Sequence, residues 1–448
     1  MKSLWTEVGP LDISLVDAPF LVALFAVTAC ALLLVLFGAT DVRRAITTVI
    51  GAVLGATVGW VTAWLLSDVW DLWGVSVSIG TRLWSAALWA AAVTVILNLR
   101  GQVVWRRVVA IVALPLCLLS AAAGVNADLG QFPTLRSAFG LSRFEPLDQA
   151  LATARSTMSA SGAAAATPDG LSAPTEDTVG VVGTVTIPAT VSGFTARAAL
   201  VYLPPAAIGR NPPALPVVEM LSGQPGSPSD VFTAGGLSDI LDRYAQLHSG
   251  LAPIVVVPDQ LGSPEQNPMC VDSGLGKSAS YLTVDVPAWI RAHLHVRAEP
   301  AGWIIAGFSQ GGTCSIQLGA AHPELFGTIL DISGELVPRN GSEAQTVTAG
   351  FGGSAAAYAA AAPSAILAEH APYAALSAIF VVGDGDTRFL PGVHAVAEAA
   401  QRAGVDTRLF ESPGTAHDWR TVNYAWITAL PIIADRTALL APAAAGTT

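Results

Sequence analysis

The sequence predicts an α-helical membrane bundle of four spans, followed by an α/β domain in which helices cover both faces of a mostly parallel sheet. Two observations carry this prediction. Four long apolar stretches occupy the first third of the 448 residues, and short apolar runs alternate with helical patterns from residue 180 onward. The composition agrees, because 52% of the residues are hydrophobic and only 12% are charged, about half the charged share of a soluble protein.

The apolar stretches cover roughly residues 19–38, 46–66, 81–98 and 104–124. Each approaches the ~20 residues that a helix needs to cross the hydrocarbon core of a bilayer. The first stretch starts late and three more follow it, which is not typical of a cleaved signal peptide. We therefore expect residues 1–124 to form a membrane anchor.

Arginines in the short loops predict the orientation of the anchor. Arg43 and Arg44 lie between spans one and two, and Arg100, Arg106 and Arg107 lie between spans three and four. The N-terminal segment and the loop between spans two and three are mainly acidic. Because basic loops stay in the cytoplasm, we expect the N-terminus and everything after about residue 125 to be extracytoplasmic.

Span two carries Gly51, Gly55 and Gly59 at four-residue spacing, which permits close approach of another helix. We call these three glycines the glycine ridge. It forms either a homo-oligomer contact or a contact with another helix of the same bundle, and the contact within the bundle is favoured. No charged residue lies in the middle of a span. A transporter or sensor role is therefore disfavoured, and the spans are interpreted as an anchor.

Residues 125–179 are predicted to form a tether. The stretch Ser156–Thr178 is rich in Ala, Ser, Thr, Gly and Pro, a composition typical of flexible linkers. Before it, Phe132–Ala152 is expected to form one short amphipathic helix at the membrane surface.

Residues 180–440 are predicted to form the extracytoplasmic α/β domain. The expected strands are Val182–Ile187, Ala198–Tyr202, Pro216–Leu221, Pro253–Val257, Gly302–Ala306, Thr328–Ile332, Ala378–Val382 and Thr407–Glu411. The expected helices are Gly236–Leu247, Tyr281–Leu294, Gln310–His322 and Pro391–Ala403. The first two strands form an antiparallel hairpin, and the alternation after them implies right-handed crossovers and a parallel sheet.

The motif Gly307-Phe308-Ser309-Gln310-Gly311 matches G-x-S-x-G between an expected strand and an expected helix. That is the nucleophile-elbow context of an α/β-hydrolase, so Ser309 is the expected nucleophile. The alternative is an ordinary glycine-rich turn. The hydroxyl needs a base, and His417 stands in the loop after the last strand, where this fold delivers its histidine.

The acid of a catalytic triad should follow the strand at 378–382. Both Asp386 and Asp384 follow that strand in Gly383–Asp386. Asp386 is the first choice, since it lies further out, where the loop leaves the sheet, and Asp384 is the alternative. The order Ser309, Asp386, His417 is the order of the α/β-hydrolase triad. The two N–H donors of the oxyanion hole are expected at Gln310 and at Gln224, since Pro225 has no N–H to offer.

The soluble half resembles the putative esterase family that includes esterase D and the actinobacterial mycolyltransferases. The resemblance rests on Gly307–Gly312, on His322–Phe326 after the helix, on the Gly383–Asp386 turn and on Gly414–Trp419. It covers residues 180–435 and implies acyl-ester chemistry without a cofactor. The chain departs from the family at Leu221-Ser222-Gly223, where His-Gly or Asp-Gly is more usual. Asp386 favours an esterase, because the mycolyltransferase branch usually has Glu there.

Four cysteines are present. Cys30 and Cys117 fall in apolar runs and are expected to be buried thiols. Cys314 lies five residues after Ser309, and Cys270 follows the strand at 253–257 near the same sheet edge. We expect these two to form a disulfide, with separate reduced thiols as the alternative. There is no CxxC motif or Cys/His cluster, so no metal site is expected.

The leading hypothesis for function is a membrane-anchored serine esterase that acts on an acyl ester of a lipid or cell-envelope amphiphile. One alternative is an acyltransferase that uses the same acyl-enzyme, and another is an inactive hydrolase domain used for binding. The Ala-rich segment 350–375 is either a lid or groove for an acyl chain, or packing helices. The net charge of −11 disfavours nucleic acid as a partner.

Overall fold

The computed structural model describes residues 9–36, 42–72, 74–99, 104–141, 144–160, 179–209 and 211–440. The chain forms two compact units. The first comprises Met1–Ser142 together with two short segments from the C-terminal half, Gly385–Arg388 and Gly414–Arg420. The second comprises the rest of the chain.

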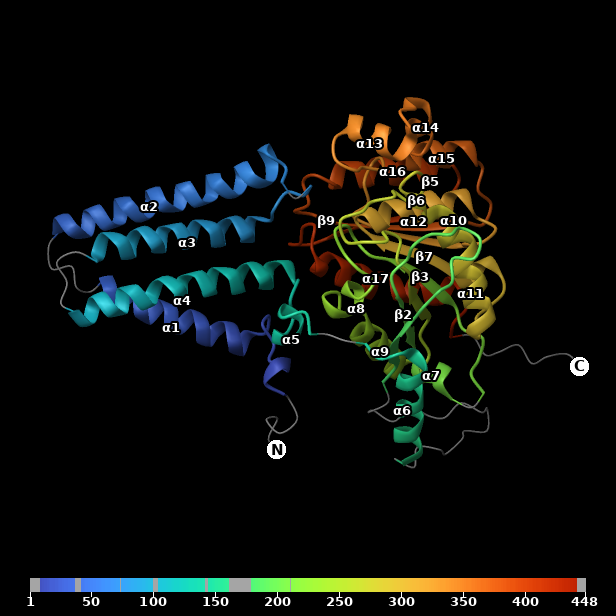
Figure 1. Ribbon diagram of the computed structural model, residues 1–448, viewed down its shortest axis with the longest axis horizontal. Helices are drawn as coiled ribbons and strands as arrows, with labels where there is room; N and C mark the ends of the chain where they lie inside the picture. Colours follow the sequence, from blue (N-terminus) through green and yellow to red (C-terminus); the bar gives the residue numbers. More distant parts are fainter. Residues whose placement is uncertain are drawn as a thin grey trace, which may run out of the picture. The chain divides into compact units, whose positions relative to one another are not determined.

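Four long helices make up most of the first unit (Figure 1). They are α1 (Ala18–Leu36), α2 (Val42–Trp64), α3 (Ile79–Asn98) and α4 (Val104–Leu129). Helix α3 packs against α2 and α4, and α1 packs against α4. All four are long and apolar enough to cross a membrane, as the sequence predicts. Arg100 lies outside the described residues, and the orientation of the bundle stays a prediction.

The glycine ridge of α2 faces α3 of the same chain. A Cβ atom on Gly55 would lie 2.7 Å from the carbonyl oxygen of Trp89, and one on Gly59 would lie 2.5 Å from that of Ser85. Gly51 packs in the same way against the side chain of Leu97. Within the described chain, the ridge is therefore used for packing inside the bundle.

Two helices stand where one surface helix is expected. Helix α5 (Leu135–Ala138) belongs to the first unit, and α6 (Leu147–Ala160) belongs to the second. The apolar side of α6 packs on the core of the second unit, and a Cβ on Gly183 would lie only 2.4 Å from Cα of Leu147. Apolar burial thus places α6 on β1. Residues 161–178, which contain most of the expected flexible tether, lie outside the described residues.

The second unit is built on an eight-stranded sheet with the order β1-β2-β4-β3-β7-β8-β9-β10. β1 pairs antiparallel with β2, β2 pairs antiparallel with β4, and the remaining neighbours are parallel. The strands are β1 (Val181–Val185), β2 (Ala199–Leu203), β3 (Val217–Leu221), β4 (Ile254–Val257), β7 (Trp303–Phe308), β8 (Thr328–Ile332), β9 (Ser377–Gly383) and β10 (Asp406–Ser412). This confirms the expected hairpin and parallel sheet.

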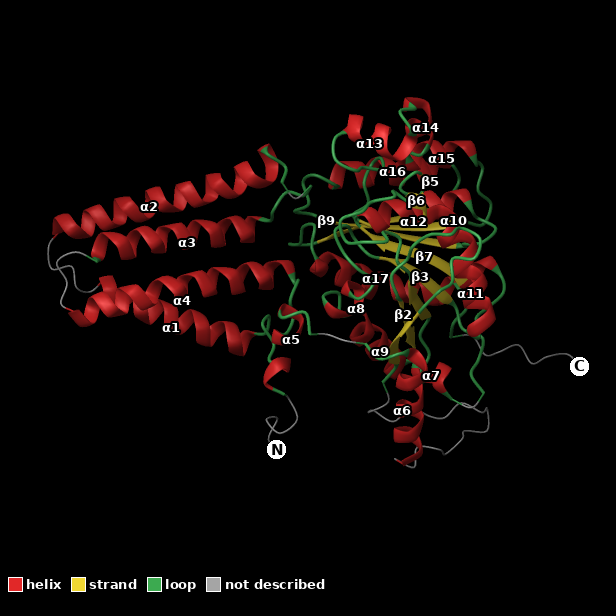
Figure 2. Ribbon diagram, in the orientation of Figure 1, coloured by secondary structure: helices red, strands yellow, loops and turns green. Residues whose placement is uncertain are grey.

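The central strands are buried along their whole length because helices cover the sheet (Figure 2). Runs of Val and Ile favour strands in such a position, and each buried side chain stabilises the fold by roughly 1.5–3 kcal/mol. A separate two-stranded hairpin joins β5 (Asp272–Ser273) and β6 (Gly276–Lys277).

Helices of the second unit connect the strands. They are α7 (Pro205–Ile208), α8 (Asp230–Thr233), α9 (Leu237–Leu247), α10 (Ser278–Ser280), α11 (Val286–His293), α12 (Gln310–Ala321), α13 (Glu343–Phe351), α14 (Ala355–Ala360), α15 (Pro363–Glu369) and α16 (Leu390–Arg402). The last described helix is α17 (Trp419–Arg436), whose first two residues belong to the first unit. Helix α12 packs on β7 and β8, and α16 packs on β9 and β10. In the Ala-rich segment 350–375, α15 packs against α12 and α16.

Candidate active site

Ser309 lies at the sharp turn between β7 and α12. Its backbone has φ 58° and ψ −119°, in a region that non-glycine residues rarely occupy. The N–H of Ser309 donates to the carbonyl oxygen of Ile332 on β8 at 2.8 Å, and its own carbonyl accepts from the N–H of Thr313 at 3.0 Å. These two bonds hold the strained turn between the strand and the helix.

The glycines on either side of Ser309 are required by close backbone packing. A Cβ on Gly307 would lie 2.0 Å from the carbonyl oxygen of Gly311. A Cβ on Gly311 would lie 2.5 Å from the carbonyl oxygens of Leu221 and Ser222. The G-x-S-x-G spacing therefore reflects the contact of this turn with itself and with the end of β3.

The loop after β3 lies beside Ser309. A Cβ on Gly223 would lie 3.6 Å from Cβ of Ser309. Gln224 is half-buried and follows directly in this loop. Gln310 is the first residue of α12, where a backbone N–H has no acceptor within its own helix. The assignment of Gln224 and Gln310 as oxyanion donors stays a prediction.

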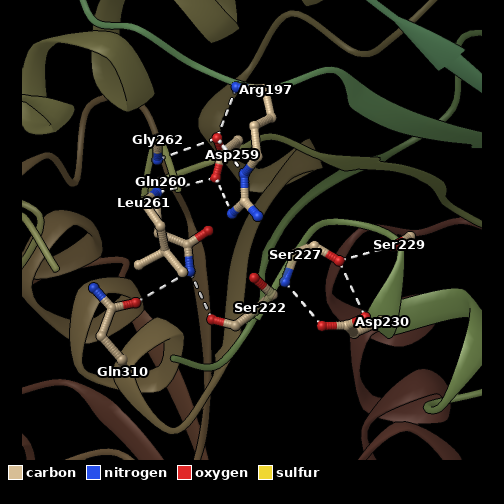
Figure 3. Close-up of polar contacts among 10 residues, drawn as sticks. All are labelled: Arg197, Ser222, Ser227, Ser229, Asp230, Asp259, Gln260, Leu261, Gly262 and Gln310. Carbon is tan, nitrogen blue, oxygen red and sulfur yellow. Dashed lines mark hydrogen bonds and ion pairs between the residues drawn. The ribbon is translucent and has the colours of Figure 1, made fainter. Parts of the chain in front are cut away.

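Three buried side-chain amides connect the loops of this region. Nε2 of Gln260 lies 2.6 Å from the carbonyl oxygen of Ser222 and 3.1 Å from Oε1 of Gln310 (Figure 3). Nε2 of Gln310 in turn donates to Oδ1 of Asn267 at 3.1 Å. The sequence motifs point to neither Gln260 nor Asn267. The one feature of the sequence that could indicate Gln260 is the polar pair Asp259-Gln260 just after an apolar strand, at the sheet edge where functional side chains often lie.

Asp259 fixes the start of the loop that carries Gln260. Its buried carboxylate pairs with the guanidinium of Arg197 through two bonds of 2.7 and 2.9 Å and accepts from the backbone N–H groups of Leu261 and Gly262 (Figure 3). Burial raises the pKa of Asp259, but its bonds with Arg197 lower it more, so the net pKa lies below its usual value. The carboxylate is therefore ionised and firmly held at neutral pH.

His417 and Asp386 form a buried pair in the first unit. Nδ1 of His417 lies 2.8 Å from Oδ2 of Asp386, and their side chains are 6% and 0% exposed. A carboxylate only accepts, so the ring N–H at Nδ1 is the donor, and in the neutral ring the lone pair then lies on Nε2. Asp384 is exposed, and its backbone N–H donates to the carbonyl oxygen of Ser412.

Charged side chains of the first unit flank this pair. Arg388, two residues after Asp386, forms an ion pair with Asp71. Arg420, three residues after His417, lies 3.1 Å from both Asp128 and Asp418. The segments that carry the candidate base and acid are thus held by ion pairs as well as by the backbone bond from Gly385 to Thr415.

Cys270 and Cys314 form a disulfide with a Cα–Cα distance of 5.5 Å. It joins the loop after β4 to α12, one turn beyond Ser309. Nε2 of Gln310 lies 3.2 Å from Sγ of Cys314, so the bridge borders the amide network. Cys30 and Cys117 are free thiols; Cys117 is buried, but Cys30 is exposed, contrary to expectation. Among the described residues, no three His, Cys, Asp or Glu side chains gather as metal ligands.

Comparison with known proteins relates this chain to one protein family. The family model described as "Putative esterase" matches residues 195–434. An uncharacterized protein of Corynebacterium glutamicum is 30% identical over 332 residues, which cover 72% of this chain and 74% of that protein.

Similar solved structures include an S-formylglutathione hydrolase from Agrobacterium tumefaciens, with 19% identity and a TM-score of 0.48 over 58% of this chain and 96% of that one. A ferulic acid esterase from Anaeromyces mucronatus has 17% identity and a TM-score of 0.45 over 59% and 94%. Members of the matched family are carboxylic ester hydrolases. The family match and the relative together show that the chain belongs to the Putative esterase family.

Proposed function

We propose that this protein is a membrane-anchored serine esterase with Ser309 as nucleophile, His417 as general base and Asp386 as the residue that orients His417. His417 takes the proton of the Ser309 hydroxyl while Oγ attacks the ester carbonyl. The alcohol leaves with that proton, and an acyl-enzyme remains. Water then attacks the acyl-enzyme with His417 again as base, which releases the acid and restores Ser309.

The strained turn at Ser309 is the observation that carries this proposal. A serine at φ 58° between a buried strand and a helix costs free energy that an ordinary turn would avoid, and such strain concentrates at functional sites. The buried bond between His417 and Asp386 supplies the other half of the chemistry. The chain order of the three residues agrees with the α/β-hydrolase fold.

Gln310 and Gln224 are the proposed donors of the oxyanion hole. Their backbone N–H groups would donate hydrogen bonds to the carbonyl oxygen and stabilise the negative charge that develops on it during attack. The position of Gly223 next to Ser309 supports this proposal, because Gln224 follows Gly223 directly.

The proposed substrate is an acyl ester of a lipid or cell-envelope amphiphile on the outer side of the membrane. The four apolar helices would keep the enzyme at the surface where such esters are found. Arg43, Arg44, Arg106 and Arg107 support an extracytoplasmic hydrolase domain through the positive-inside rule. The disulfide between Cys270 and Cys314 supports it too, because such bonds persist in oxidising compartments.

Fluorophosphonate labelling of the purified full chain in detergent tests the proposal. We expect wild type to be labelled and Ser309→Ala to be unlabelled. Ser315→Ala is a matched control on the same helix, because its hydroxyl donates to the carbonyl of Gly312, and we expect it to be labelled like wild type. An unlabelled wild type would contradict the esterase and favour a binding domain, and equal labelling of Ser309→Ala would contradict Ser309 as the nucleophile.

The fate of the acyl group separates an esterase from an acyltransferase. After p-nitrophenyl butyrate is offered together with a sugar or lipid alcohol, an esterase releases butyrate as the main product. Accumulation of the new ester would instead favour the transferase.

A further inference from the structure

Three buried amide side chains, those of Asn267, Gln310 and Gln260, form a continuous hydrogen-bonded row behind the proposed oxyanion hole. Their exposed fractions are 4%, 5% and 0%. Buried amides usually satisfy their polar atoms in one defined way, because a misplaced donor or acceptor costs about 1–3 kcal/mol. The row therefore has a direction that its backbone contacts decide.

Asn267 sets the direction at one end. Its Oδ1 accepts from the backbone N–H of Met269 at 2.9 Å, and its Nδ2 donates to the carbonyl oxygen of Arg339 at 2.7 Å. Neither backbone group can change its role. Oδ1 of Asn267 is therefore an acceptor, and the nitrogen of Gln310 must face it.

Ser222 sets the direction at the other end. Its carbonyl oxygen can only accept, so the group 2.6 Å away is the nitrogen of Gln260. The other hydrogen of that nitrogen then donates to Oε1 of Gln310 at 3.1 Å. Both ends of the row thus require the same orientation of all three amides.

Gln260 joins the two chain segments that carry the proposed oxyanion donors (Figure 3). Ser222 lies two residues before Gln224, and the side chain of Gln310 belongs to the residue whose own N–H is the second donor. Gln260 is itself held in place, because the neighbouring Asp259 pairs with Arg197. A displacement of either segment would break a hydrogen bond to a fixed group.

We propose that Gln260 is a positioning residue that sets the distance between the two oxyanion donors. This inference rests on the proposed esterase function. Donors must lie 2.7–3.1 Å from the place where the oxyanion forms, and errors well below 1 Å weaken them. Gln260 then matters for binding of the tetrahedral state and little for binding of the ester, so its loss affects kcat more than KM.

Gln260→Met is the primary test, because Met keeps a similar volume and donates no hydrogen bond. With p-nitrophenyl butyrate and the full chain in detergent, we expect kcat to fall about 10- to 100-fold and KM to change less than about twofold. The affinity for an alkyl trifluoromethyl ketone, which forms a tetrahedral adduct with the serine, should fall by a similar factor.

Gln317→Met is the matched control. Gln317 is also buried on α12 and donates to a backbone carbonyl, that of Ala361 at 2.7 Å, away from the oxyanion loop. We expect this variant to lose a comparable amount of thermal stability and to keep kcat and ketone affinity within about twofold of wild type. If Gln260→Met does not fold, Gln260→Leu replaces it, since Leu is apolar and has no group that can donate a hydrogen bond.

Three outcomes would overturn the inference. One is a folded Gln260 variant whose kcat and ketone affinity stay within about twofold of wild type, and another is a rise in KM alone. The third is an equal loss of kcat in Gln317→Met, which would show a general effect of buried amides. Fluorophosphonate labelling separates this inference from the esterase proposal. If wild type is not labelled, the esterase proposal is contradicted. If the Gln260 variants are labelled and keep their affinity for the ketone, only the positioning role of Gln260 is contradicted.

Discussion

Asp386 and Asp384 stand two residues apart after the same strand, but their surroundings differ. Asp386 is fully buried and bonds to Nδ1 of His417, whereas Asp384 is exposed. A buried carboxylate on Nδ1 both fixes the tautomer of the imidazole and stabilises its protonated form. Of the two candidates, Asp386 therefore has the contacts that the triad acid needs.

Asp386→Asn is predicted to lower kcat by roughly 10³- to 10⁴-fold with little change in stability. The amide keeps the shape of the carboxyl group but cannot favour the tautomer in which Nε2 is the base. The measurement is steady-state hydrolysis of p-nitrophenyl butyrate by the detergent-solubilised full chain.

Asp384→Asn is the control for this substitution. It has the same chemistry at an exposed position, and we expect its kcat to stay within about threefold of wild type. If Asp384→Asn proved the more damaging of the two, Asp384 would be the triad acid and the assignment of Asp386 would be wrong.

At the residue scale, the sequence predicts those candidate site residues that lie in a motif or at a defined position after a strand. Ser309 lies in a motif with its own spacing, and His417 follows the last strand. Gln260 and Asn267 have no such signal. They come from one irregular loop, and their amides meet Gln310 through tertiary contacts: the ion pair of Asp259 with Arg197 holds the start of that loop, and the disulfide ties the loop to α12.

At the element scale, the packing of α2 on α3 depends on the absence of side chains. Cβ atoms on Gly59 and Gly55 would lie only 2.5 and 2.7 Å from the carbonyl oxygens of Ser85 and Trp89. Helices in a membrane gain stability from close van der Waals contact, because lipid tails are as apolar as the side chains they replace. The two glycines thus set the distance between the helices.

Gly55→Val is predicted to push α2 away from α3 and to lower the Tm of the full chain in detergent. Overpacking of a well-packed contact typically costs about 1–3 kcal/mol. Thr57→Val is the control, because Thr57 is exposed on the same helix and its side chain is similar in size to that of the Val which replaces it. Equal Tm values for Gly55→Val and Thr57→Val would show that the close contact contributes no stability.

Elements with strong local patterns are predicted well, and those decided by tertiary contacts are not. Every strand of the large sheet falls within one or two residues of its expected bounds, since apolar β-branched runs are decisive there. The sequence predicts one surface helix over Phe132–Ala152, whereas the chain has α5 and α6 there, and the apolar side of α6 packs on the protein core, which an apolar pattern does not distinguish from a lipid surface. Helix α17 was not expected at all, although Trp426 on it is fully buried.

At the scale of the whole molecule, buried acids make stability depend on pH. Asp331 is buried at the end of β8, and desolvation raises its pKa to about 7 despite the hydrogen bond that it accepts from the N–H of Gly334. The folded chain therefore keeps this carboxyl protonated at pH values where the unfolded chain has already lost the proton. Its contribution to stability is most favourable below about pH 4 and is lost as pH rises through about 7.

Asp331→Asn is predicted to become more stable relative to wild type as pH rises from 5 to 8. The amide oxygen still accepts from Gly334, but it never ionises. A pKa rise of about three units corresponds to at most roughly 4 kcal/mol, so the difference in Tm between the two proteins should change by several degrees. Glu219 is also buried and has a raised pKa, but it is present in both proteins and cancels in the comparison. A Tm difference that is independent of pH would contradict the prediction.

The bridge between Cys270 and Cys314 has a practical consequence for anyone who produces this protein. A host that makes it in a reducing cytosol would yield chains in which the loop of Gln260 and Asn267 is no longer covalently tied to α12. Such material would lack the covalent tie between that loop and α12 and would not represent the native hydrolase domain. Expression strains with an export route to an oxidising compartment, and purification without thiol reagents, are therefore the appropriate choice.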